Sequence, residues 1–152
     1  MTTFIGNIEA RADAKGRVFL PSSYRRLLPD NERERVVMRR DPDNACLILY
    51  PESVWNRKVE DFKEKLDEWN ADDQMLLMQF VSDAEWIDID SQGRILLAKR
   101  NLQAINASTD VLFVGMIDRI AIWNKATYEA TKLSRNDFAK QLSEKMKKRN
   151  ND

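Results

Sequence analysis

Apolar and polar residues form two series of similar segments along the chain, one before and one after a helical middle. In each series an alternating strand is followed by a short apolar strand, a short helix and two further strands. The predicted strands are 7–12, 17–20, 36–40 and 45–50 in the first series, and 85–90, 94–97, 111–115 and 119–123 in the second. The predicted short helices are 22–28 and 98–105. The pattern therefore predicts strand–turn–strand, helix, strand–turn–strand, twice.

The two series are copies of one repeat. Residues 8–20 align with residues 85–97 and place Asp, Gly and Arg at the same internal spacing. The matched residues are Asp13, Gly16 and Arg17 in the first copy, and Asp90, Gly93 and Arg94 in the second. Residues 47–52 also resemble residues 120–125, and a duplication explains two matched segments better than chance does. We predict a first repeat at 3–55, a helical connection at 56–80, a second repeat at 81–130, and a C-terminal basic helix and tail at 131–152.

Helical periodicity marks the connection between the repeats. An apolar stripe recurs at spacings of four and three residues over 52–69, which predicts a helix that packs by one face. Its members are Trp55, Val59, Phe62, Leu66 and Trp69. Asp72 is expected to cap a second helix, whose apolar stretch 75–81 is suited to an interface.

Local capping signals predict two further helices. Ser134, with Asp137 three residues later, resembles a capping box and begins a helix with one apolar stripe. The stripe contains Phe138, Leu142 and Met146, and the helix closes with Lys145, Lys147, Lys148 and Arg149, where cations complement the helix dipole. In the first repeat, Pro21 is expected to end a strand, and Ser22 or Ser23 to cap the short helix that follows.

Composition narrows the class of protein. A chain of 152 residues can bury one substantial core, or two small cores that share an interface. No secretion signal or bilayer-length apolar run is present, so we expect a cytoplasmic protein without a membrane segment. Cys46 is the single cysteine and lies in an apolar run, and the chain has no histidine. We therefore expect no enzyme, no metal and no cofactor.

The formal net charge is zero, but the charges are unevenly distributed along the chain. Residues 1–40 carry nine Lys or Arg against five Asp or Glu. Residues 41–92 carry four against fourteen, and residues 93–152 carry twelve against six. Basic ends therefore flank an acidic middle, a distribution that allows a positive surface for phosphates as well as ordinary solvated helix faces.

Asp13–Gly16 and Asp90–Gly93 are predicted four-residue turns. An Asp at the first position accepts nearby backbone N–H groups, and a Gly at the fourth takes the left-handed conformation, so both aspartates are expected to be structural. Arg17 and Arg94 follow directly and can pair with a carboxylate. The alternative is a proton-sharing pair of aspartates for peptide hydrolysis. The D-[ST]-G pattern of such enzymes is missing, and the neighbouring arginines favour ionised carboxylates.

Taken together, these features resemble the MraZ family. They are the paired D-x-x-x-R motifs, Gly6, the run Lys15–Pro21 followed by Tyr24 and Arg25, and the segment Gly115–Trp123. The resemblance spans residues 3 to about 142. It implies an α+β fold with a mainly β core, namely a duplicated swapped-hairpin AbrB-like barrel of the double-psi type with peripheral helices. It also implies a ring-shaped homo-oligomer of the octamer or dodecamer class that binds repeated sites upstream of a division and cell-wall gene cluster.

The resemblance implies that DNA contact falls mainly to the first motif, and the charges agree. Cations of the first repeat cluster in its turn and in the helix that follows: Arg11, Lys15, Arg17, Arg25 and Arg26. The second repeat offers Arg94, Lys99 and Arg100, with the neutral Gln92 at the position that corresponds to Lys15. The first repeat is therefore the better predicted DNA-binding surface.

A narrow hairpin can enter the major groove, where arginine binds guanine O6 and N7 through two N–H groups, whereas lysine suits phosphates. We predict that Arg17 and Arg25 contact base edges and that Lys15 and Arg26 contact phosphates. The expected partner is double-stranded operator DNA at the nucleoid, and a ring would gain affinity through several weak sites. The alternative is a structural ring or interaction scaffold without DNA binding, which the zero net charge and the apolar stretch 75–81 favour.

Overall fold

The computed structural model describes residues 3–150, and side chains as far as residue 147. Residues 151–152 of the predicted tail, and the side chains of Lys148 and Arg149, lie outside the described part. The first copy contains β1 (Asn7–Arg11), β2 (Arg17–Phe19), α1 (Ser22–Arg25), the 3-10 helix η1 (Asp30–Glu32), β3 (Arg35–Arg40) and β4 (Leu47–Tyr50). The second contains β5 (Glu85–Asp88), β6 (Arg94–Leu96), α4 (Lys99–Ala104), β7 (Asp110–Gly115) and β8 (Ile120–Trp123). The predicted order of elements is therefore present twice.

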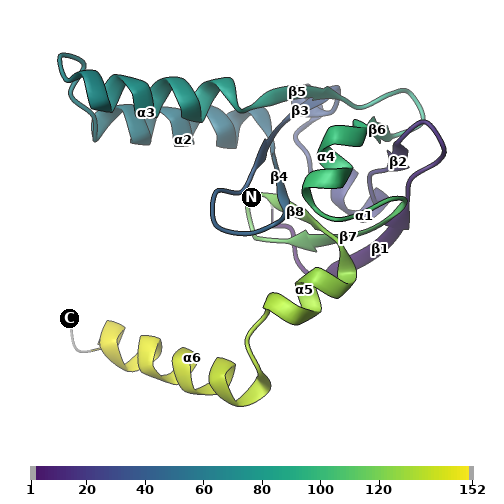
Figure 1. Ribbon diagram of the computed structural model, residues 1–152. Coiled ribbons are helices and arrows are strands. Elements are labelled where there is room, and N and C mark those ends of the chain that lie inside the picture. The colour runs from purple at the N-terminus through teal and green to yellow at the C-terminus, as the bar shows by residue number, and fades with distance from the viewer. Residues whose placement is uncertain (1–2, 151–152) are drawn as a thin grey trace.

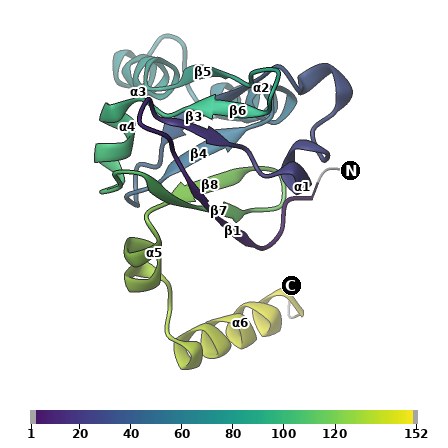
Figure 2. The same ribbon diagram turned by 90° about the vertical axis from the view of Figure 1, so that its right-hand side faces the viewer.

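Strands of the two copies exchange partners across one large antiparallel sheet. Its strand order is β1-β7-β8-β4-β3-β5, so the first strand of each copy pairs with a strand of the other copy (Figure 2). Ile8 of β1 faces Phe113 of β7, and Ile87 of β5 faces Val36 of β3. The two copies meet at the centre, where β4 pairs with β8. Neither copy can complete its sheet without the other.

The predicted closed barrel is not found among the described residues. β2 and β6 pair with each other in a separate two-stranded sheet, here called the ribbon, and the six-stranded sheet does not close. The ribbon strands are three residues long, and each pairs over its whole length with the corresponding strand of the other copy. The architecture is therefore a mixed α/β fold with a large antiparallel sheet and peripheral helices (Figure 1).

Both faces of the sheet are buried. Alternate residues of β4 point to opposite faces, so that Leu47 and Leu49 join one core while Ile48 and Tyr50 join another. The first core lies between the sheet and the ribbon, which contributes Val18 and Ile95, together with α1 and α4. The second core lies under α2 (Glu52–Glu64), α3 (Ala71–Ser82) and α5 (Lys125–Thr131). Burial on both faces explains why β4 and β8 are continuous apolar runs.

The helical connection differs from its prediction in length and in its cap. α2 ends at Glu64 instead of continuing to residue 69, and Trp69 is 89% exposed. The chain turns back between α2 and α3 over 65–70, and Asn70, not Asp72, caps α3 by accepting the Asp73 N–H at 3.0 Å. The shorter helix keeps the inner part of the predicted stripe: the Trp55 and Phe62 rings both pack against Phe80 of α3.

The other capping predictions have different outcomes. Ser134 does cap α6 (Arg135–Asn150), accepting the Asp137 N–H at 3.1 Å. The predicted serine cap of α1 is wrong, because Pro21 occupies the cap position and both serines lie inside the helix. α5 is not predicted by the sequence pattern, and it begins after Asn124, whose Oδ1 accepts the Ala126 N–H at 2.8 Å. Within residues 3–150, no helix has the length and apolar character needed to cross a bilayer.

Candidate nucleic-acid interface

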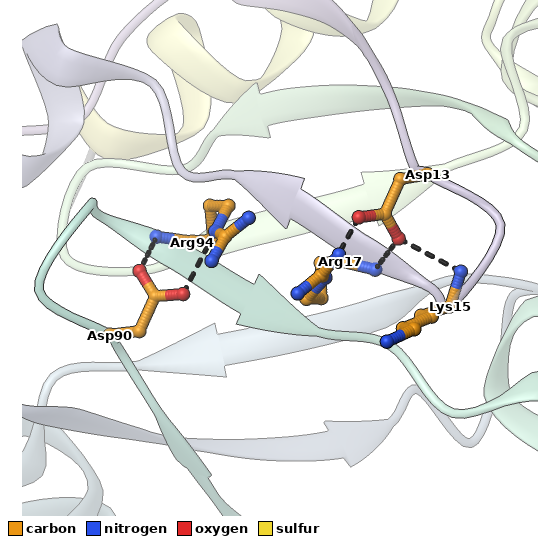
Figure 3. Close-up of polar contacts among 5 residues, drawn as sticks. All are labelled: Asp13, Lys15, Arg17, Asp90 and Arg94. Atoms are coloured by element: carbon orange, nitrogen blue, oxygen red, sulfur yellow. Dashed lines mark hydrogen bonds and ion pairs between the residues drawn. The ribbon is translucent and has the colours of Figure 1, made fainter.

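A single carboxylate organises the first turn. Oδ1 of Asp13 accepts hydrogen bonds from the backbone N–H groups of Lys15 at 2.9 Å and Arg17 at 3.0 Å (Figure 3). Oδ2 of Asp13 accepts a third bond from Nε of Arg17 at 2.8 Å. The backbone closes the same turn through the Gly16 N–H, which donates to the Asp13 carbonyl at 2.9 Å. Asp13 therefore shapes the turn and also fixes the direction in which the Arg17 side chain leaves β2.

The second turn repeats this arrangement bond for bond. Oδ1 of Asp90 accepts the backbone N–H groups of Gln92 at 2.9 Å and Arg94 at 2.8 Å. Oδ2 of Asp90 accepts Nε of Arg94 at 2.9 Å. The two arginines differ in exposure: the Arg17 side chain is 38% exposed and the Arg94 side chain 22%. The first turn therefore presents its arginine more openly to solvent.

The electrostatics of the two aspartates do not fit a proton-sharing pair. The Arg17 backbone N–H, followed by the Arg17 side chain and the Lys15 N–H, lowers the pKa of Asp13 below its ordinary value. The Arg94 backbone N–H, its side chain and the Gln92 N–H do the same to the pKa of Asp90. Figure 3 shows the two aspartates at opposite ends of the ribbon, each bonded to its own arginine. A dyad that shares a proton needs one strongly raised pKa, so this geometry does not support hydrolysis.

Glycine is required in both turns. Gly16 has a φ of +89° and Gly93 a φ of +84°, in the left-handed region that side chains other than glycine disfavour. A Cβ on Gly16 would overlap the Leu97 carbonyl oxygen, and one on Gly93 would overlap the Arg25 guanidinium. The glycine carbonyls also bind across the copies: the Leu97 N–H donates to Gly16 at 2.8 Å, and the Leu20 N–H donates to Gly93 at 2.9 Å. Each turn is therefore held by a backbone hydrogen bond from the opposite copy.

Because strands pair between the two copies, the five predicted DNA-binding residues do not share one site. Arg11 and Arg17 line a shallow groove with Phe19 and Arg94. Lys15 lines a second depression, where its neighbour is Lys99 at the start of α4. The helix cation beside the first turn is therefore Lys99 of the second copy.

Arg25 and Arg26 lie beside the second turn, where they line a depression with Arg33, Asp90 and Gly93. Arg25 is half-buried: its Nε donates to the Leu20 carbonyl at 2.9 Å, and its guanidinium lies against Gly93. Arg26 is exposed. The structure therefore places two of the predicted contacts at the turn whose motif residues come from the second copy.

The outer face of the ribbon holds two apolar residues that the sequence prediction missed. In the antiparallel register Arg17 lies opposite Leu96, and Phe19 lies opposite Arg94, while Val18 and Ile95 face the core. Phe19 and Leu96 are exposed. The alternation along each strand could have indicated this, because a residue next to a buried valine in a strand must face outward. The ribbon thus presents two arginines and two large apolar side chains on one face.

Known proteins resemble the chain along its whole length. The family model described as "MraZ protein, putative antitoxin-like" matches residues 3–78 and 80–150. A Bacteroides fragilis protein named transcriptional regulator MraZ is 45% identical over 147 residues, which are 97% of this chain and 93% of the relative. Its namesake from Bacteroides thetaiotaomicron is 45% identical over 150 residues, 99% of this chain and 96% of the relative. A third, from Clostridium tetani, is 33% identical over 143 residues, 94% of this chain and 96% of the relative. These relatives are named as transcriptional regulators and not as enzymes, and the chain described above belongs to the MraZ family.

Proposed function

We propose that the protein is a sequence-specific regulator of transcription that binds double-stranded DNA through the first turn and the outer face of the ribbon. The observation that carries this proposal is the first turn itself, where Asp13 holds Arg17 through Nε on an exposed hairpin next to Lys15. An arginine bound by its Nε keeps two terminal nitrogens for another partner. Bidentate binding of guanine O6 and N7 needs two such donors, held in one direction.

The other cations are assigned by position. Lys15 at the tip of the turn, Arg11 at its base and Arg26 at the C-terminal cap of α1 are exposed and suit phosphates, which position a protein on DNA. Arg25 is assigned to holding the second turn, because its guanidinium is already engaged against Gly93. Phe19, which lines the same groove as Arg17, is suited to apolar contact with a thymine methyl group.

Family membership supports a finer form of the proposal. The protein acts as a ring-shaped homo-oligomer and binds repeated sites upstream of a division and cell-wall gene cluster, in the cytoplasm at the nucleoid. The pairing of strands between the two copies suits the swapped-hairpin part of the resemblance. Several weakly binding turns on one ring would engage regularly spaced repeats together, so that effective concentration supplies the affinity that one turn lacks.

The test compares arginines in matched surroundings. Arg17→Ala and Arg94→Ala each remove the same ion pair from the same type of turn, so they disturb local structure alike. Fluorescence anisotropy with labelled duplex from upstream of the gene would measure affinity, after the protected bases have been mapped. Because a bidentate base contact is worth about 1–3 kcal/mol, Arg17→Ala is expected to lower affinity by about 5- to 150-fold, and Arg94→Ala to lower it less. Both variants should keep the oligomeric state of the wild type.

Each other outcome has a distinct meaning. Wild-type affinity in Arg17→Ala would refute the role of the first turn in reading DNA. Equal losses in both variants would show that the two turns contribute alike, in contradiction to the assignment of DNA contact mainly to the first. A further comparison uses the turn tips: Lys15→Gln, which copies the residue at Gln92, is expected to reduce the dependence of affinity on salt by about one phosphate contact.

A structural ring or interaction scaffold without DNA binding is the second candidate. The exposed apolar side chains of α3 and α6 favour it, because they suit protein partners. Salt dependence separates the two functions, since binding through phosphates must weaken strongly as salt increases. The absence of salt-dependent binding to upstream DNA would favour the scaffold.

A further inference from the structure

α6 is a long helix whose described side chains are not covered by the rest of the described chain. All its described side chains, residues 135–147, are exposed, and both views show the helix extending away from the sheet (Figures 1 and 2). Its stripe of Phe138, Leu142 and Met146 remains 50–58% exposed. An isolated helix of 16 residues is only marginally stable in water, and most helices in proteins are stabilised by packing an apolar face. The stripe of α6 therefore needs a surface to cover it.

The duplication shows what α6 lacks. In the first copy α3 folds back onto α2, and its Phe80 ring stacks on Trp55 with centroids 5.2 Å apart. In the second copy Tyr128 of α5 packs on Trp123 in the same way that Trp55 packs on Tyr50. The chain then leaves α5 in an extended conformation at Lys132, and none of the α6 side chains described, residues 135–147, is buried. α6 comes after the second copy as α3 comes after the first. The described side chains of α6, however, do not pack on the chain as Phe80 of α3 packs on Trp55.

The outer side of α3 is a second uncovered apolar surface. Met75 and Met78 lie one turn apart on its exposed side, flanked by Leu76 and Val81, and all four side chains are exposed. The stretch 75–81 extends about 9 Å along its helix, and the stripe of α6 about 12 Å, at a rise of about 1.5 Å per residue. The two surfaces are therefore comparable in length.

The charges of these two surfaces are opposite. The α2–α3 segment, residues 52–83, carries nine Asp or Glu against four Lys or Arg. The α6 segment, residues 135–150, carries six Lys or Arg against two Asp or Glu. Two α6 helices would repel each other, and so would two α2–α3 hairpins, whereas one of each attracts. The charges therefore favour contact between one α6 helix and one α2–α3 hairpin.

We propose that α6 of one protein molecule packs along the outer side of α3 in a second molecule of the same protein. The stripe of α6 lies on the two methionines, and its lysines lie beside the acidic α2–α3 hairpin. The contact joins two different surfaces. In a pair of molecules, one therefore keeps a free α3 and the other a free α6, and each can bind a further molecule. Such head-to-tail contacts close into a ring if the rotation between copies allows it. The inference rests on the assembly named in the proposed function and identifies the segments that hold it together.

Cross-linking between full-length copies tests the contact directly. Met78→Cys and Leu142→Cys would be placed on separate copies with different tags, expressed together, and treated with a short bis-maleimide. Cys46 is buried and serves as the unreactive background. A cross-linked dimer that contains one copy of each kind, and that forms only in the mixture, is expected. A dimer from Leu142→Cys alone would show pairing between α6 helices. An internal cross-link in a variant that carries both Met78→Cys and Leu142→Cys would show α6 folded onto its own chain. Either result, or no cross-link at all, overturns the proposal.

The mass of the assembly gives a second measurement with a matched control. Leu142→Gln removes the centre of the stripe, whereas Ser143→Gln places the same side chain at the next position, off the stripe. Light scattering is expected to show Leu142→Gln shifted toward single copies of 17.8 kDa and Ser143→Gln unchanged. An unchanged mass in Leu142→Gln together with salt-dependent DNA binding would overturn this inference and leave the proposed function intact. If Leu142→Gln reduces the mass of the assembly and the wild type does not bind DNA, this inference stands and the proposed function is refuted.

Discussion

Gly16 is the position where the first turn, the exchange between copies and the proposed interface meet, so Gly16→Ala is an informative perturbation. Any residue other than glycine at a φ of +89° costs about 1–2 kcal/mol, because Cβ crowds the following carbonyl. The added methyl also overlaps the Leu97 carbonyl oxygen, a backbone atom that cannot swing aside. The turn must move, which breaks the 2.8 Å hydrogen bond from the Leu97 N–H to Gly16, worth about 1 kcal/mol.

Gly6 supplies the control for this substitution. Its φ is +79°, close to that of Gly16, but apart from its chain neighbours no atom of residues 3–150 lies within 4 Å of the position that its Cβ would occupy. Gly6→Ala therefore carries the conformational cost of about 1–2 kcal/mol alone. Gly16→Ala is expected to cost about 2–3 kcal/mol, a substantial part of the stability of about 5–15 kcal/mol that proteins have. The difference between the variants measures the contact between the turn and the opposite copy.

Urea unfolding at one fixed protein concentration provides the assay, because assembly makes apparent stability depend on concentration. With a slope of about 2 kcal/mol per molar urea, Gly16→Ala should lower the midpoint by about 1–1.5 M and Gly6→Ala by about 0.5–1 M, with unchanged slopes. Equal midpoints for the two variants would refute the reasoning, since they would mean that the first turn does not rest on residue 97. Gly16→Ala should also weaken DNA binding, and Gly6→Ala should not.

Three further outcomes are expected. Burial, with a smaller effect of Asp41, raises the pKa of the Cys46 thiol from 9.0 to about 12, so Ellman's reagent should react with it roughly a thousandfold more slowly in the folded than in the unfolded chain. The lowered pKa of Asp13 stabilises the fold above the ordinary value of 3.8, so the stability difference between wild type and Asp13→Asn should vanish as pH falls through that lowered pKa. The Tyr24 hydroxyl donates to the Gly6 carbonyl at 2.9 Å, so Tyr24→Phe should lower the urea midpoint by the equivalent of about 1 kcal/mol, with no change in DNA affinity.

The parts of the fold that depend on neighbouring residues could be predicted from the sequence. The turn at Asp13 and the cap at Ser134 depend on contacts within four residues, and both motifs are visible in the printed chain. The predicted helix is too long because the apolar stripe continues past Glu64, where α2 ends, and the chain then turns back before the cap of α3 at Asn70. Periodicity reports which face of a helix is apolar, but it does not report where the chain turns back.

The exchange of strands could not be predicted from the same signals. Pairing of β1 with β7 joins residues about a hundred positions apart, and neither strand encodes its partner in its own alternation of residues. Arg25 illustrates the consequence: it follows the first turn in the sequence, but it lies beside Asp90 and Gly93 of the second turn. Phe80 shows the same limit, since its stack on Trp55 and its contact with the Arg39 guanidinium, 4.5 Å from the ring centroid, join segments that are distant in sequence.

The exchange also bears on why the chain carries two repeats when the charges favour only one for DNA contact. The first turn is supported by the Leu97 N–H and lies beside Lys99, both from the second copy, so the second repeat would hold the proposed DNA-binding turn in place even if its own turn contributed little to DNA contact. An isolated first repeat would lack β6 and β7, the strands against which β2 and β1 are formed. The second repeat is therefore required as the rigid support of the proposed DNA-binding turn, and its own turn is free to differ in sequence at Gln92 as long as Asp90, Gly93 and Arg94 preserve the backbone.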